Sequence, residues 1–405
     1  MSLLSDLVVV DLTRALAGPH AAMMLGDLGA RVIKVEHPEG GDDSRGWGPP
    51  FVGTAQDRQS TYHMCCNRNK ESVTADLKSA EGAALLRRLV RQSDILCENF
   101  RPGVLDRLGF SVAHLRELNP RLIVLSITGF GHDGPAGGRA GYDQIAQGEA
   151  GLMSVTGQPG EPMKVGLPIG DLLAGMYGVT GVLAALHERE STGRGRVVRT
   201  SLLAAIVGVH AYQGTQWTVA HEVPQPIGNQ HPSISPYGLF HAQDAPVQIA
   251  CGSESLWRAF APLVGVRYDD ERFATNADRV QHRAELGALV DTALAAAPAA
   301  IWIERLADAG VPAGLVRSLD QVYAWDQTRS QGLVVSVEQP GLGTVELPGP
   351  PVRFDDLPYA GGRPSHDPPP GLGEHTESVL AWLDRTEAGQ REESRRSDSG
   401  WVGAQ

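Results

Sequence analysis

Short apolar runs rich in β-branched residues alternate with longer amphipathic stretches over the first ~130 residues. The apolar runs predict buried strands at 7–13, 31–36, 72–77, 94–100 and 122–130. Residues 20–30 and 80–93 carry apolar positions at helical spacing and are long enough to cross from one strand to the next. This alternation predicts an α/β fold: an open, Rossmann-like parallel sheet with ligands near the carboxyl ends of its strands.

The pattern changes in the second half of the chain. Residues 172–190 predict an apolar helix that ends at Gly193, before a strand-like run at 197–207. Pro, Gly, His and Ser then become frequent, and a short helix is expected at 377–384. We predict a large domain over 1–222, a smaller α+β domain over 223–311, a return to the large domain over 312–385 and a frayed, polar C-terminal tail over 386–405.

Composition narrows the class of protein. A chain of 405 residues favours a two-domain enzyme, and the net charge of −12 argues against a nucleic-acid partner. There is no apolar run long enough to span a bilayer, and the N-terminus lacks the basic flank and cleavage site of a signal peptide. The four cysteines have no metal-ligand spacing, so we assign them no chemistry. We expect a cytoplasmic protein without a membrane partner.

The sharpest chemical feature is Gly170-Asp171 directly before the apolar helix. The structural interpretation is that Asp171 is the N-cap, whose carboxylate accepts N–H bonds from the first turn. The functional interpretation is a nucleophile, because those N–H groups and the helix dipole would hold the carboxylate ionised. Both can hold at once, and neither is proved by the local pattern.

Other motifs point less sharply to chemistry. Residues 129–134 match the dinucleotide pattern GxGxxG, but Pro135 and Gly137 follow where a phosphate-binding helix should start, so a glycine-rich active-site loop fits better. Arg101 and Arg107 follow a strand end and could hold phosphates or be solvated surface charges. No GxSxG, HExxH or CxxC motif occurs, and we predict no metal site.

Taken together, several blocks resemble the class III CoA-transferases, the CaiB/BaiF type, over nearly the whole chain. The matching blocks are 8–51, 67–78, 98–110, 119–135, 140–157, 170–178 and 372–380. The resemblance implies a large CoA-binding domain, an interlocked homodimer, and coenzyme A or an acyl-CoA thioester as substrate together with a free carboxylic acid, with no permanently bound cofactor. It implies that Asp171 is the nucleophile. By position, the residues implied to line the CoA moiety are Ala17, His37, Ala75, Asn99, Phe100, Arg107, Gly129 and Phe130.

Departures from the family pattern refine the substrate. The glycine-rich flap of the oxalate enzymes is absent, which disfavours oxalate, and the blocks around residues 46–51, 348–354 and 371–375 look most like the subgroup that transfers CoA from succinyl-CoA to glutarate, hydroxymethylglutarate and other dicarboxylates. Arg196 and Arg199 replace a neutral amide and an acid of the family. For the oxyanions formed during transfer, backbone N–H groups of the 129–131 turn or of Gly170 are the candidate donors.

Two rival functions remain. A 2-methylacyl-CoA racemase shares the fold implied by the resemblance, but such racemases carry a histidine where this chain has Tyr142, and a neutral tyrosine is a poor base near pH 7. A CoA-binding protein that has lost its chemistry is the other alternative, and the intact Asp171 argues against it.

Overall fold

The computed structural model describes residues 2–399, with side chains as far as residue 391. The chain forms two compact units: unit 1 comprises residues 2–152, 165–218 and 326–399, and unit 2 comprises 153–164 and 219–325. Compared with the predicted division, the short segment 153–164 joins the second unit, and the chain returns to the first unit at residue 326 instead of 312.

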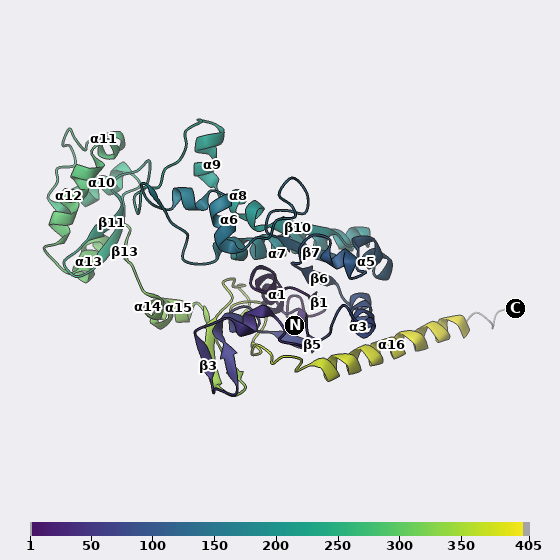
Figure 1. Cartoon of the computed structure of the whole chain (residues 1–405). Helices are drawn as coiled ribbons and strands as arrows, with labels where there is room; N and C mark the ends of the chain where they lie inside the picture. Colours follow the sequence, from purple (N-terminus) through teal and green to yellow (C-terminus); the bar gives the residue numbers. More distant parts are fainter. Residues whose placement is uncertain (1, 400–405) are drawn as a thin grey trace. The chain divides into compact units, whose positions relative to one another are not determined.

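Six parallel strands form the central sheet of unit 1, in the order β10-β7-β6-β1-β2-β5 (Figure 1). Their bounds are β1 Val8–Asp11, β2 Arg31–Glu36, β5 Lys70–Thr74, β6 Ile95–Glu98, β7 Ile123–Thr128 and β10 Val197–Ser201. The predicted open α/β sheet is confirmed. Because β1 lies between β2 and β6, the order of the strands reverses at β1, and a crevice is expected where the loops after β1 and β6 separate.

Alternate residues of the strands face opposite helical layers, because successive side chains of a strand point to opposite faces of the sheet. Val9 and Val32 pack with α1 (Ala17–Asp27), α7 (Ile169–Thr192) and α8 (Leu202–Gly208). Val10 and Ile33 pack with α3 (Ala80–Arg91), α5 (Val112–Leu118) and α16 (Thr376–Ser399). The sheet is therefore buried on both faces, which explains why its strands are continuous apolar runs.

Small residues let α7 approach α1 closely. A Cβ at Gly175 would lie 2.8 Å from the Ala17 carbonyl oxygen, and a Cβ at Gly178 would lie 3.0 Å from a methyl of Leu125 on β7. The second turn of α7 is thereby held against the start of α1, and the third against β7. At its other end α7 stops at Gly193, whose φ of 67° a glycine adopts without steric cost.

Two predicted elements differ from the structure. The strand-like run 197–207 divides into β10 and α8, because the Ser201 side chain accepts the Ala204 N–H and starts a helix there. The short helix expected at 377–384 continues as α16 to Ser399, so the predicted frayed tail is helical over 386–399. Glu387 in this stretch forms an ion pair with Arg88 of α3, and Gln390 hydrogen-bonds Gln92. Residues 400–405 of the predicted tail lie outside the described residues.

Unit 2 is a small α+β unit around an antiparallel sheet, β11 (Tyr237–His241), β12 (Pro246–Ala250) and β13 (Ala313–Leu315). Its core gathers aromatic side chains, among them Trp257, Phe260 and Trp302. The other helices and strands of unit 2 are β8 Gly157–Gln158, β9 Glu161–Pro162, α10 Glu254–Phe260, α11 Asn276–Gln281, α12 Arg283–Leu294, α13 Ala299–Asp308 and α14 Leu319–Ala324. The remaining elements of unit 1 are β3 Phe51–Gly53, β4 Arg58–Ser60, α2 Thr61–Met64, α4 Val104–Arg107, α6 Asp143–Glu149, α9 Ala211–Thr218, α15 Asp326–Ser330, β14 Val334–Gln339 and β15 Gly343–Pro348.

The expectation that no apolar run is long enough to span a bilayer is wrong for α7, which among the described residues is the one single helix long and apolar enough to do so. Helices α12 and α13 reach that composition only together and are bent by 110°. The buried side of α7, which includes Ala174, Val179 and Val182, packs on the sheet of unit 1. Core helices of globular proteins share this length and composition. The helix is an integral part of the unit 1 core.

Candidate active site

A cavity of about 220 Å³ opens at the reversal point of the sheet, between the loops after β1 and β6. Its wall is formed by Arg14, Ala15, Leu16, Ala17, Asp43, Asn99, Phe100, Arg101, Pro102, Ile127, Thr128, Gly129, Arg139, Ala140, Gly141, Tyr142, Asp171 and Leu202. Asp171 is the carboxylate at the start of α7 in this wall. A larger cavity of about 580 Å³ lies along β11–β13 of unit 2, but its lining contains no carboxylate, cysteine, serine or histidine. The chemistry therefore points to the smaller cavity.

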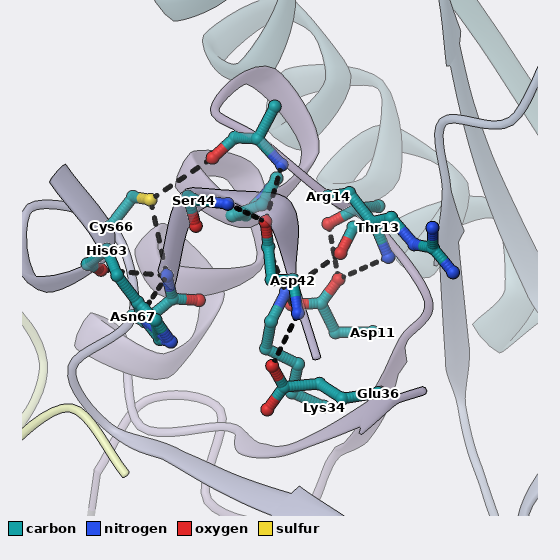
Figure 2. A network of polar contacts seen from close by, with 12 residues as sticks. Asp11, Thr13, Arg14, Lys34, Glu36, Asp42, Ser44, His63, Cys66 and Asn67 are labelled. Atoms are coloured by element: carbon teal, nitrogen blue, oxygen red, sulfur yellow. Dashed lines mark hydrogen bonds and ion pairs between the residues drawn. The ribbon is translucent and has the colours of Figure 1, made fainter. Parts of the chain in front are cut away.

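Side chains from distant parts of the chain hold the loop after β1 in place by hydrogen bonds (Figure 2). Lys34 Nζ donates to the Thr13 carbonyl oxygen at 2.8 Å, and Asp42 Oδ1 accepts the Ala15 N–H at 3.1 Å. The Asn99 side chain accepts the Arg14 N–H at 2.9 Å and donates to the Arg14 carbonyl oxygen at 2.8 Å. Ala15 has a φ of 67°, a left-handed conformation that an L-alanine adopts only when its surroundings impose it. The loop is thus preorganised on the cavity wall.

The side chains that hold the loop belong to a fully buried ionic cluster. Lys34 lies 2.9 Å from Asp42 and 3.8 Å from Asp11, and Lys70 lies 2.9 Å from Asp11. Burial opposes ionisation of Asp42, but the Lys34 ammonium and the N–H groups of Ser44 and Ala15 together outweigh burial and lower the pKa of Asp42 well below its usual value. Likewise, burial lowers the pKa of Lys34, while Asp11 and Asp42 raise it above its usual value. Each charge has a partner, which is the condition for keeping charges in a protein interior.

Asp171 is the third residue of α7, not its N-cap. The N-cap is Pro168, and no side chain of the capping residue bonds the first turn. The free N–H groups are satisfied from another helix instead: Asp143 Oδ1 on α6 accepts the Gly170 N–H at 2.7 Å and the Asp171 N–H at 3.4 Å. The predicted cap is therefore wrong, because α7 begins at Ile169, two residues before Asp171, and a carboxylate from another helix accepts N–H groups of its first turn.

The electrostatics of Asp171 also differ from the prediction. Burial, and then the negative charge of Asp143, raise the pKa of Asp171 from its usual 3.8 to about 7. The expectation that the first-turn N–H groups hold it ionised is wrong, since Asp143 accepts those groups. A carboxyl with a pKa of about 7 changes charge near neutral pH, and ionisable groups perturbed in this way gather at functional sites.

The predicted CoA-lining residues divide between two places. Ala17, Asn99, Phe100 and Gly129 line the cavity together with Asp171. The other four, His37, Ala75, Arg107 and Phe130, are not part of its wall.

Two of these outer residues lie at the carboxyl ends of neighbouring strands. His37 follows β2 with its Nε2 atom 4.0 Å from Asp76 Oδ1, and Ala75 is buried after β5. Arg107 ends α4, and Phe130 is buried beneath the guanidinium of Arg139, which does line the cavity.

The oxyanion donors expected from the sequence are partly occupied. The Gly170 N–H donates to Asp143, and the Gly131 N–H donates to Thr128 Oγ1 at 3.0 Å. The prediction that Gly170 serves as an oxyanion donor is therefore wrong in this structure. Of the predicted donors, Gly129 is the one in the cavity wall.

Several residues of the site were missed from the sequence. Asp143 and Gln147 of α6 are among them, as are Arg14 and Arg139, whose guanidinium groups line the cavity. Tyr62 is another: burial and the nearby charge of Asp171 raise the pKa of its phenol above the usual value. The sequence does contain one indication of the buried ionic cluster. Two charged residues, Lys34 and Glu36, lie inside the run 31–36, and a charge in a buried strand needs a partner.

No group of three or more His, Cys, Asp or Glu side chains that could hold a metal ion is found in the described part of the chain. The cavity instead combines one carboxylate of raised pKa with three arginines, Arg14, Arg101 and Arg139. This set of groups can attract an anionic substrate and offer a carboxylate as nucleophile.

Known proteins similar to this chain include several CoA-transferases. The chain is 41% identical to "Succinate--glutarate CoA-transferase" of Agrobacterium fabrum, over 95% of this chain and 96% of that protein. It is 38% identical to "Acetyl-CoA:oxalate CoA-transferase" of Acetobacter aceti, over 89% of this chain and 92% of that protein. A crystal structure of a CAIB/BAIF family protein from Brucella suis superimposes with a TM-score of 0.83 at 40% identity, covering 93% of this chain and 98% of that one. Residues 4–376 match the family described as CoA-transferase family III, and the chain belongs to that family.

Proposed function

We propose that this CoA-transferase moves CoA from succinyl-CoA to glutarate or another short dicarboxylate, with Asp171 as the covalent nucleophile. The observation that carries the role of Asp171 is its position in a cavity at the reversal point of the sheet, with its pKa raised to about 7. The choice of acids is supported by the relative named for succinate and glutarate, at 41% identity.

In the proposed reaction, an Asp171 oxygen attacks the thioester carbon of succinyl-CoA, the C–S bond breaks, and CoA leaves as a thiolate. The thiolate attacks the Asp171 carbonyl carbon of this mixed anhydride, which releases succinate and leaves an aspartyl-CoA thioester. The acceptor carboxylate then attacks the same carbon and again releases the thiolate. Finally the thiolate takes the acyl group of the second anhydride, and the Asp171 carboxylate is regenerated.

The charges around the cavity suit anionic substrates. Arg14, Arg101 and Arg139 line it, and both the acceptor acid and the phosphates of CoA carry negative charge. We propose that Ala17, Asn99, Phe100 and Gly129 contact the part of CoA near the thioester, because they share the wall with Asp171. His37, Ala75, Arg107 and Phe130 are proposed to bind parts of CoA farther from the reacting carbon.

The substrate assignment is tested by incubating the protein with succinyl-CoA and a panel of free acids and detecting new acyl-CoA by mass spectrometry. We expect glutaryl-CoA or another dicarboxylyl-CoA, and little oxalyl-CoA. Transfer to oxalate in preference to glutarate would refute the proposed acceptor class. Exchange of the α-proton of a 2-methylacyl-CoA without any acceptor acid would replace transfer by racemisation, and CoA binding without either reaction would indicate a non-catalytic protein.

We further propose a cytoplasmic homodimer in which a second copy covers the exposed side of α7. This side carries Met176, Tyr177 and Leu183, and the following α8 segment adds Val207 and Val209, all exposed. Exposed apolar side chains grouped in this way mark interaction surfaces. Sedimentation equilibrium is expected to give twice the chain mass of 43.2 kDa, and a stable monomer at micromolar concentration would exclude this assembly.

A further inference from the structure

Helix α6 holds the segment that leads into α7. Gln147 is fully buried, and its Oε1 accepts the Val165 N–H at 2.8 Å. Because an N–H can only donate, this bond fixes the orientation of the Gln147 amide. Its Nε2 then donates to the Leu167 carbonyl oxygen at 3.3 Å and to Asp143 Oδ2 at 2.7 Å. The other oxygen of Asp143 accepts the N–H groups of Gly170 and Asp171, so that the two side chains bind four backbone groups between Val165 and Asp171.

Gly170 makes this arrangement sterically possible. A Cβ at Gly170 would lie 3.1 Å from Asp143 Oδ1 and 3.0 Å from Ile206 Cδ1. Such contacts are tighter than most real Cβ contacts, so a larger residue would push the carboxylate away. The close approach of the Asp143 carboxylate therefore explains why the residue before Asp171 is a glycine.

The first turn of α7 consequently gives Asp171 no donors. An aspartate at the third helical position ordinarily interacts with the free N–H groups of the first turn. Here Asp143 occupies those of Gly170 and Asp171, and among the described residues the Asp171 carboxylate accepts no hydrogen bond. Its oxygens stay available at the cavity wall.

We propose that Asp143, held by Gln147, is a positioning residue for CoA transfer, which fixes the start of α7 and keeps the Asp171 carboxylate free to attack. This inference rests on the proposed role of Asp171 as nucleophile. Asp143 is not part of the cavity wall, and it acts through the backbone N–H groups of Gly170 and Asp171. Its negative charge also contributes to the raised pKa of Asp171.

Other ionisable groups share the surroundings of Asp171, and they come from several elements of unit 1. They are His20 on α1, Tyr62 on α2, Asp143 on α6, Asp43 before α2, and the arginines of the cavity wall, Arg14, Arg101 and Arg139. Of these, Asp143 is the one whose charge raises the pKa of Asp171, in addition to burial. Removal of that charge should therefore move the titration of Asp171 in a defined direction.

Two substitutions separate the hydrogen bond from the charge. Asp143→Asn keeps an oxygen that can accept the Gly170 N–H but removes the charge and the bond from Gln147 Nε2, so the midpoint of the acidic limb of kcat/KM is expected to fall by about one pH unit. Asp143→Ala removes both, and kcat is expected to fall ~10- to 100-fold through misplacement of the nucleophile, with the KM for succinyl-CoA little changed. The matched control is Asp6→Asn, at an exposed position of the same unit. It is expected to change neither the midpoint of the acidic limb nor kcat.

A readout independent of turnover keeps the inference testable if the proposed reaction fails. The carboxyl carbon of Asp171 is identified by NMR of protein labelled with ¹³C-aspartate, as the resonance lost in Asp171→Asn. We expect it to titrate near pH 7 in the native chain and at lower pH in Asp143→Asn. An unchanged titration midpoint in Asp143→Asn, or kcat within about twofold of the native value in a folded Asp143→Ala, would overturn the positioning role. Loss of all transfer in the native protein with an intact NMR shift would instead refute only the proposed reaction.

Discussion

Asp171→Asn is expected to lower kcat for CoA transfer by roughly 10⁴- to 10⁶-fold, the range found when a covalent nucleophile is removed from an enzyme. An amide oxygen is too weak a nucleophile to attack a thioester, and the asparagine side chain cannot form the anhydride. The side chain keeps nearly the same shape, so CoA binding should persist. Transfer is measured by the formation of glutaryl-CoA from succinyl-CoA and glutarate.

The covalent intermediate gives a second measurement. When the native protein is mixed with succinyl-CoA without an acceptor, mass spectrometry of the denatured protein is expected to show an adduct on the peptide that contains Asp171, and hydroxylamine should remove it. Asp171→Asn should show no adduct, whereas the control Asp6→Asn should behave like the native chain. Transfer within about tenfold of the native rate in Asp171→Asn or Asp171→Ala would exclude this residue as the nucleophile.

The same substitution is expected to stabilise the fold at pH 8. The pKa of Asp171 is about 7 in the folded chain against 3.8 for the free side chain, so between these values the folded state holds a proton that the unfolded state has lost. The unfavourable ionisation of Asp171 is therefore absent below pH 3.8 and fully present above pH 7. Asp171→Asn removes this ionisation and should therefore raise the free energy of unfolding by about 4 kcal/mol at pH 8 and by about 1 kcal/mol at pH 4.5.

Urea unfolding of the native chain, Asp171→Asn and Asp6→Asn at the two pH values measures this difference. The increase should shrink as pH falls, because protonation of the native Asp171 removes the same charge as the substitution does. A variant that is less stable than the native chain at pH 8 would show that the Asp171 carboxylate is not electrostatically destabilising. An increase independent of pH would assign the effect to packing.

The sheet could be predicted because each strand is recognisable from its own local sequence. Runs such as VVV at 8–10 and LIVL at 122–125 are continuous and apolar, as is typical of strands buried on both faces, and their spacing leaves room for crossover helices. The division of 197–207 into a strand and a helix was not predicted, since its apolar residues suit either element. There the Ser201 cap decided the outcome.

The surroundings of Asp171 could not be predicted, because they depend on residues far away in the sequence. Asp143 lies 28 positions before Asp171 and reaches it only after α6 has packed against α7. Local sequence preferences favour an N-cap for a Gly-Asp pair before a helix. They do not take account of a second carboxylate that packs against the pair from another helix. The raised pKa of Asp171 is likewise a property of the packed unit.

The placement of Asp171 beside Asp143 bears on whether this chain is still an enzyme. A side chain that weakens its own fold is removed by ordinary mutation and drift unless selection retains it, because most proteins lie only slightly above the stability they need. Asparagine differs from aspartate at this position by one functional group and would relieve the electrostatic repulsion. The presence of aspartate at position 171, at the cavity wall and beside Asp143, therefore favours an active enzyme over a protein that binds CoA without catalysis.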